Sequence, residues 1–89
     1  MTAVTQTEIA ARAKLNGFDG SQETAIINVV FAAMWSASLP VDRIAAIASA
    51  ICNATVSVET AQRAATKGVK AGILRTHVIA RVRYYELTL

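Results

Sequence analysis

The chain has 89 residues, 54% of them hydrophobic, and a formal net charge of +3 at pH 7. A chain of this length builds one domain that buries roughly 60–65% of the surface its unfolded form exposes, and such small domains often gain stability by oligomerising. With one cysteine, one histidine, no converging pair of carboxylates and no glycine-rich loop, the sequence predicts no disulfide, metal, cofactor or catalytic activity.

The N-terminal residues contain no basic segment followed by an apolar one, so we expect no secretory signal and a cytoplasmic protein. In that reducing compartment Cys52 is expected to be a buried, inert thiol. The uncharged stretch Thr24–Val41 approaches the ~20 residues that cross a bilayer. It contains Asn28 and Pro40 and lacks flanking clusters of Lys or Arg, so it predicts a buried helix and no membrane contact.

Two helices are predicted in the N-terminal part. The first begins near Thr5, places Ile9 and Ala13 on one side, and ends at Asn16-Gly17. The second runs from Gln22 to Ala37, with Asp19 or Ser21 as its cap. It is apolar nearly all round, which is typical of a helix central to the fold or shared with another subunit. We expect both, with a dimer surface that contains Phe31, Met34 and Trp35.

A third helix of about eleven residues is predicted after Pro40, which fits its first turn. Its apolar residues Ile44, Ile47, Ala48 and Ile51 follow helical spacing. Residues 52–56 then form a short non-helical joint, in which Asn53 tolerates a left-handed conformation.

The fourth helix is expected from Ser57, its N-cap, to Ala71, and Gly72 closes it. Its predicted inner stripe is apolar and small, and comprises Val58, Ala61, Ala65, Gly68 and Val69. The opposite face then presents Thr60, Arg63 and Lys67.

Composition changes after Gly72 to β-branched and aromatic residues, which predict strands at Ile73–Val78 and Val82–Thr88 with a tight turn at Ile79–Arg81. No Gly, Asn, Asp or Pro marks that turn, and a C-terminal helix is the alternative. Strand alternation predicts one face with Arg75 and His77 on the first strand and one face with Arg81 and Arg83 on the second. Val82 and Tyr84 are then expected to pack on the helices.

Positive charge is concentrated in the C-terminal part of the chain. Between Thr60 and Tyr85 there are six basic residues and no acid, against three basic residues and six acids elsewhere. Such segregation indicates a surface that meets phosphate, although a solvated basic face is the simpler alternative. The six are Arg63, Lys67, Lys70, Arg75, Arg81 and Arg83.

The order of parts from Val41 to Leu89 resembles a winged helix-turn-helix domain. The most specific piece is KAGIL followed about ten residues later by RYYEL. In small bacterial, phage and plasmid regulators a similar phrase marks the exit from the recognition helix and the return strand of the wing. The fold class expected is mainly α (α+β), with about four helices followed by a C-terminal two-stranded hairpin. One domain, 1–89, would contain N-terminal helices and the dimer surface at 1–38, the helix-turn-helix at 41–72 and the wing at 73–89.

This sequence departs from that pattern at two places. Gly68 stands where a leucine usually anchors the recognition helix, so it requires unusually close packing or leaves Val69 as the anchor. The wing tip is short and apolar, without the usual Gly or Asn.

The resemblance implies sequence-specific binding of double-stranded DNA by a homodimer that acts as a transcriptional repressor or accessory regulator. Thr60 and Arg63 would read base edges, with Gln62 beside them if the helix rolls slightly, while Lys67 and Lys70 would meet phosphates. The alternative is an interaction module that keeps the winged-helix shape and binds another protein through its apolar second helix or the edge of its wing. The predicted DNA contacts are Ser57, Thr60, Gln62, Arg63, Lys67 and Lys70 on the helix and Arg75, His77, Arg81 and Arg83 on the wing.

Overall fold

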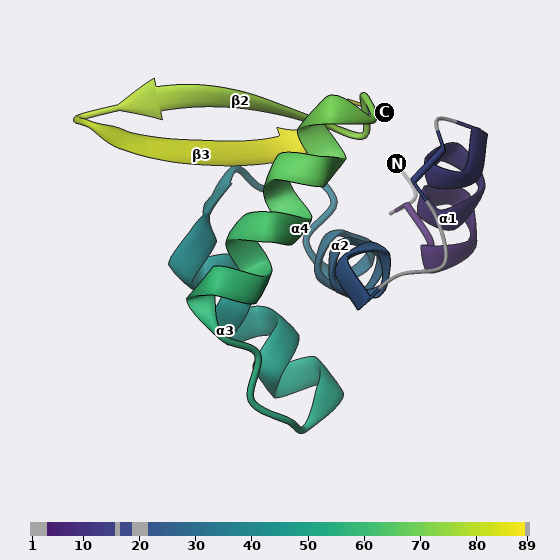
Figure 1. Cartoon of the computed structure of the whole chain (residues 1–89), viewed down its shortest axis with the longest axis horizontal. Coiled ribbons are helices and arrows are strands. Elements are labelled where there is room, and N and C mark those ends of the chain that lie inside the picture. The colour runs from purple at the N-terminus through teal and green to yellow at the C-terminus, as the bar shows by residue number, and fades with distance from the viewer. Residues whose placement is uncertain (1–3, 16, 19–21, 89) are drawn as a thin grey trace.

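The computed structural model describes residues 4–15, 17–18 and 22–88. Four helices and an antiparallel three-stranded sheet with strand order β1-β3-β2 form a winged helix-turn-helix fold (Figure 1). In chain order the elements are α1 (Gln6–Leu15), α2 (Gln22–Ala33), β1 (Leu39–Pro40), α3 (Val41–Cys52), α4 (Val58–Lys70), β2 (Leu74–Ile79) and β3 (Val82–Leu87). The predicted helix stop at Asn16 and the caps Asp19 and Ser21 lie outside the described residues.

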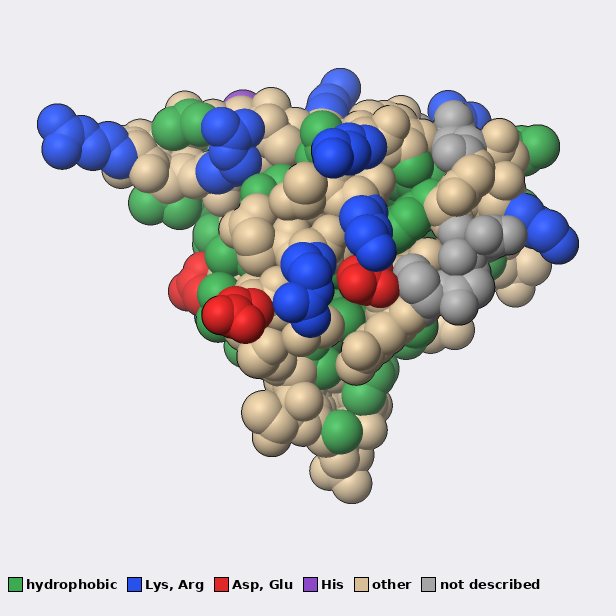
Figure 2. All heavy atoms as spheres, viewed as in Figure 1, with side chains coloured by type: hydrophobic (Ala, Val, Ile, Leu, Met, Phe, Trp, Pro, Cys, Tyr) green, Lys and Arg blue, Asp and Glu red, His purple; other side chains and the backbone are tan. Residues whose placement is uncertain are grey.

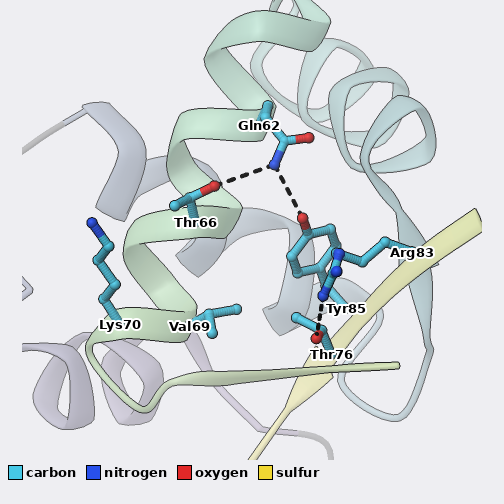
Figure 3. Close-up of a pocket in the computed structure, with 7 residues that line it drawn as sticks. All are labelled: Gln62, Thr66, Val69, Lys70, Thr76, Arg83 and Tyr85. Carbon is cyan, nitrogen blue, oxygen red and sulfur yellow. Dashed lines mark hydrogen bonds between the residues drawn. The ribbon is translucent and has the colours of Figure 1, made fainter. Parts of the chain in front are cut away.

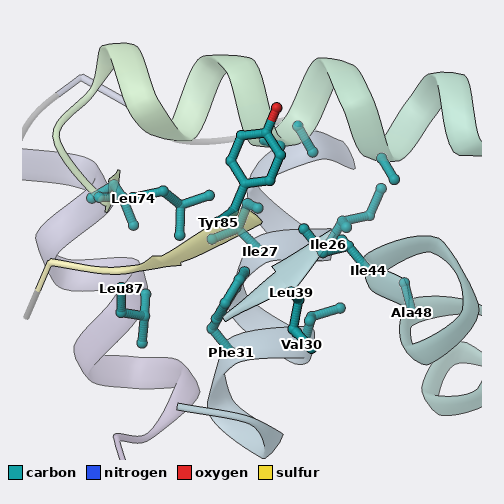
Figure 4. Packing of buried hydrophobic residues seen from close by; sticks show 14 of the residues in the cluster. Ile26, Ile27, Val30, Phe31, Leu39, Ile44, Ala48, Leu74, Tyr85 and Leu87 are labelled. Carbon is teal, nitrogen blue, oxygen red and sulfur yellow. The ribbon is translucent and has the colours of Figure 1, made fainter. Parts of the chain in front are cut away.

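Helix α2 is the centre of the core, as its apolar surface predicts. Ile27, Val30 and Phe31 are fully buried, and α1, α3 and α4 all pack on this helix (Figure 4). Phe31 was predicted on a dimer surface, and this is wrong because the chain's own core encloses it. The helix ends at Ala33, four residues before the predicted Ala37. Within the described residues, no helix is both long enough and apolar enough to span a membrane.

The turn between α3 and α4 is held by a serine. Ser49 Oγ accepts a 2.9 Å hydrogen bond from the backbone N–H of Val56 and donates a 2.7 Å bond to the carbonyl of Ala45. Asn53 ends α3 in the left-handed conformation predicted for it, with φ of 52°. Ser57 caps α4 and accepts from the N–H of Thr60 at 3.1 Å. Cys52, predicted to be buried, is exposed at the end of α3.

Helix α4 is rolled relative to its predicted orientation. Its buried residues are Ala61, Ala64, Ala65 and Gly68, whereas Val58 and Val69 are exposed. Small side chains let α4 approach α2 and α3 closely, and this close approach favours the alanine face over the two valines. At 100° per residue the outward face therefore turns by roughly 40°, so that it centres on Arg63, Thr66 and Lys70.

Gly68 packs closely, as one of the two alternatives for this position required. A Cβ at Gly68 would lie 2.9 Å from Cδ1 of Leu74, so the buried Leu74 side chain fills the space beside the glycine. Leu74, in the strand that follows α4, therefore fills the place of the leucine that usually stands within the helix. Gly72 closes the helix with φ of 77°, as predicted.

The C-terminal hairpin is confirmed, but its register reverses one predicted face. The turn has two residues, Ala80 and Arg81, and Ile79 pairs with Val82. The predicted turn had three residues, and a slip of one residue moves every side chain of a strand to the other face. Tyr85 is therefore buried and Tyr84 half-buried, the reverse of the inward orientation predicted for Tyr84.

A third strand was not predicted from the sequence. Leu39 and Pro40 form β1, which pairs antiparallel with β3 through Leu39–Tyr85 and Pro40–Tyr84. Because β1 directly precedes α3, this pairing attaches the hairpin to the start of the helix-turn-helix.

Candidate nucleic-acid interface

The outer face of α4 is polar and accessible. The side chains of Arg63 and Lys67 are 60% and 54% exposed, and Thr66 and Lys70 are also exposed. Thr60, predicted to read base edges, is half-buried and takes part in the cap: its hydroxyl lies 2.9 Å from Ser57 Oγ. Thr60 Oγ1 also accepts from Arg63 Nη2 at 3.4 Å, which draws this arginine toward the N-terminal end of the helix.

An acid from α2 lies beside these cations. Glu23 Oε1 is 3.4 Å from Lys67 Nζ and 3.9 Å from Arg63 Nε, and the Glu23 side chain is only 16% exposed. This carboxylate was not predicted at the site, because it is 44 residues from Lys67 and nothing in the local sequence indicates the contact. It neutralises part of the positive charge on α4.

A groove of about 330 Å³ separates the C-terminal half of α4 from the hairpin (Figure 3). Gln62 spans it: the side-chain amide nitrogen donates to Thr66 Oγ1 at 3.2 Å and to the Tyr85 hydroxyl at 3.1 Å. Both amide hydrogens are thereby used within the chain. Tyr85 and Thr66 were not predicted at this site, because their positions depend on the hairpin register and on the roll of α4.

Two cations line this groove from opposite sides. Lys70 comes from the last turn of α4, and Arg83 comes from β3, where its Nη1 donates a 2.8 Å hydrogen bond to Thr76 Oγ1. Arg83 also lines a second hollow of about 350 Å³ together with Arg81 and Asp42, at the start of α3. The residues on the two sides of the groove therefore form one surface of cations and hydroxyl groups that extends from α4 to the hairpin.

The other face of the hairpin carries the remaining predicted wing residues. Glu86 Oε1 is 3.3 Å from Arg75 Nε and 3.4 Å from His77 Nδ1, and the His77 ring stacks on Tyr84 with centroids 5.7 Å apart. In β2, Arg75 and His77 alternate with Thr76, which faces the groove beside Arg83. The predicted single basic face of the ribbon is therefore wrong: Arg83 faces the groove, and Arg75 and His77 face away.

Most of the predicted basic residues nevertheless gather in one region. Figure 2 shows Lys and Arg side chains in a band along α4 and outward along the hairpin. Arg63 and Lys67 belong to this band because both pair with Glu23, and Lys70, Arg81 and Arg83 belong to it because they line the two hollows. We call these five residues the basic wall.

No protein-family model matches the sequence, and no curated protein matches it. Among solved structures, a manganese uptake regulator is similar, with a TM-score of 0.73 and 18% sequence identity. The similarity covers 100% of this chain and 62% of that regulator's chain, so this chain spans less than two thirds of its length. At this identity the likeness establishes the fold.

Proposed function

We propose that this chain binds double-stranded DNA, with α4 in the major groove and the hairpin along the neighbouring backbone. The observation that carries the proposal is the basic wall, which is built on the second helix of a helix-turn-helix and on the wing that follows it. In this class of fold the second helix is the element that enters the major groove.

The residues of the wall divide by their chemistry. Arg63 lies on the outward face of α4 and has the planar fork that matches guanine O6 and N7. Thr66 shares that face, and Gln62 has both amide hydrogens engaged, so its Oε1 is the atom left to accept from a base. Lys67, Lys70, Arg81 and Arg83 supply phosphate contacts.

We further propose that the protein is a homodimeric transcriptional regulator, a repressor or an accessory factor of a phage or plasmid type. Two copies would address half-sites one turn of DNA apart, or multiples of it. Met34 and Trp35 remain the predicted dimer residues, since Met34 is exposed and Trp35 is partly exposed just after the end of α2.

Salt-titrated binding tests the proposal. Counterion release gives a slope of about −0.9 in log K against log[salt] for each phosphate neutralised. The four cations assigned to phosphates set a limit of roughly −3.6 for one copy, and the pairing of Lys67 with Glu23 lowers the expected value to about −2.7 to −3.6. The measurement uses a fluorescent 30-bp duplex, and about −2.7 is the smallest slope compatible with the proposal.

An interaction module on the same scaffold is the competing function. It predicts no binding to the duplex, or binding whose affinity does not change with salt. The predicted route through the apolar surface of α2 is restricted, because Ile26, Ile27, Val30 and Phe31 are buried in the chain's own core.

Replacing Glu23 by Gln should strengthen duplex binding by about threefold to tenfold at about 0.15 M salt. The substitution keeps the size of the side chain and removes the negative charge that pairs with Arg63 and Lys67. Fluorescence anisotropy with the 30-bp duplex measures the change.

The matched control is Glu86→Gln, which removes an acid paired with Arg75 and His77 on the other face of the hairpin. We expect its affinity to stay within about twofold of the wild type. Equal gains from the two variants would show that net charge, and not the position of Glu23, determines binding.

A further inference from the structure

The end of the hairpin exposes apolar side chains that have no role in the core. Val78, Ile79 and Val82 are 56%, 57% and 43% exposed. Ile79 and Val82 pair across the hairpin and share the face of His77 and Tyr84, whereas Val78 lies on the opposite face across from Arg83. We call these three residues the apolar tip.

The tip is narrow and projects beyond the helices. Figure 1 shows β2 and β3 extending past the helices to a turn at the far end. That turn consists of Ala80 and Arg81, both with positive φ, 52° and 68°. Left-handed backbone at a residue with a Cβ costs about 1–2 kcal/mol. The chain therefore accepts strain to make the shortest hairpin connection with apolar residues on both sides of it.

The charges around the tip indicate the chemistry of its partner. Arg81 lies in the turn and Arg83 one residue beyond Val82, and the sequence has no acid between Glu59 and Glu86. The acid of another element beside them is Asp42, which lines the hollow at the start of α3 with Arg81, Val82 and Arg83. An apolar end flanked by cations fits a ligand with an apolar interior and anionic edges. In a DNA duplex the bases are that interior and the two phosphate backbones are those edges.

We propose that the apolar tip enters the minor groove, inserts Ile79 and Val82 against a base step, and bends the duplex. The inference rests on the proposed function, because α4 in the major groove brings the hairpin to the adjacent minor groove. The backbones of two paired strands are about 4.8 Å apart before side chains are counted. The minor groove of B-DNA is about 6 Å wide, so the ribbon fits only if the groove opens. Apolar wedges open it by partly unstacking a base step, which kinks the duplex by about 20–90°.

The double variant Ile79→Thr/Val82→Thr tests this inference in the full chain. Threonine keeps the β-branched shape that favours strands, and both side chains are exposed, so the fold should persist. The probe is a duplex selected with the wild-type chain from a random pool. In one form this duplex contains 2-aminopurine, whose fluorescence reports unstacking of the bases. In a second form the same sequence is placed at different positions along longer DNA fragments, and the gel mobility of their complexes reports bending.

We expect the wild type to bend this duplex by at least about 20° and to raise 2-aminopurine fluorescence. The double variant should lose both effects and bind about fivefold to tenfold more weakly, with an unchanged salt slope. Arg81→Ala should instead lower the slope by about 1. Leu15→Thr, at an exposed apolar residue of α1, is the matched control and should bind and bend like the wild type.

Several results would overturn the inference. Wild-type binding with the expected salt slope to a straight duplex would reject the wedge and leave the proposed function intact. The same conclusion follows if the double variant still bends the duplex. It also follows if the double variant keeps its duplex affinity and loses only self-association, measured by sedimentation, or only binding to vesicles of 70% phosphatidylcholine and 30% phosphatidylserine. If the wild type binds no duplex, the proposed function and the wedge both fail.

Discussion

Exchanging Arg63 and Lys70 together for glutamate should weaken binding of every duplex by about a hundredfold at about 0.15 M salt. Both residues lie on the outward face of α4, and Lys70 also lines the groove next to the hairpin. The variant removes two cations and adds two anions on the surface that is proposed to lie against phosphates. The salt slope should become shallower by at least about 1, because Lys70 is the phosphate contact that the variant removes.

Lys14→Glu is the control for net charge. Lys14 is exposed near the end of α1, a helix that packs on α2 and contributes nothing to the basic wall. We expect less than a twofold change in affinity, because salt at about 0.15 M screens exposed charges that lie more than ~8 Å apart. A loss similar to that of the double variant would mean that the duplex does not lie on α4.

Single alanine variants separate the two roles on α4. Arg63→Ala should reduce discrimination between selected and random duplexes by about 1–3 kcal/mol, because it removes a contact to a base edge. Lys70→Ala should weaken both duplexes alike and lower the salt slope by about 1. Equal effects from the two variants would contradict the assignment of Arg63 to bases and Lys70 to phosphates.

Replacing Phe31 by Ala should destabilise the fold by about 3–5 kcal/mol. Phe31 is fully buried in α2, the helix on which the other three pack, so the substitution leaves a cavity at the centre of the core. A domain of this size has a total stability of roughly 4–13 kcal/mol, so a large share would be lost. The midpoint of urea denaturation, followed by far-UV circular dichroism, measures the effect.

Met34→Ala is the comparison, three residues along the chain at a side chain that is 38% exposed. It should cost less than about 1 kcal/mol when the chain is dilute. If Met34 lies on the proposed dimer surface, the same variant should weaken self-association in sedimentation. A large loss of stability in dilute Met34→Ala would contradict the structure's division between the core and the end of α2.

The sequence by itself determined most of the elements of this protein. Helical spacing of apolar residues located the four helices, and the end points of α4 followed from Ser57 and Gly72, because capping and left-handed backbone depend on the local residue types. The β-branched and aromatic residues after Gly72 located the hairpin in the same way. The concentration of cations after Thr60 was also visible in the sequence alone.

Only the tertiary structure decided which way these elements face. The valines and alanines of α4 form two apolar stripes, and close packing against α2 and α3 selected the alanines. The hairpin turn has two residues and contains no glycine that would predict it from the sequence. Its register placed Tyr85 inward and turned Arg75 and His77 away from the groove. Glu23 joined the site from a distant helix. Orientation depends on contacts between segments far apart in the chain, and these leave no local signal in the residues themselves.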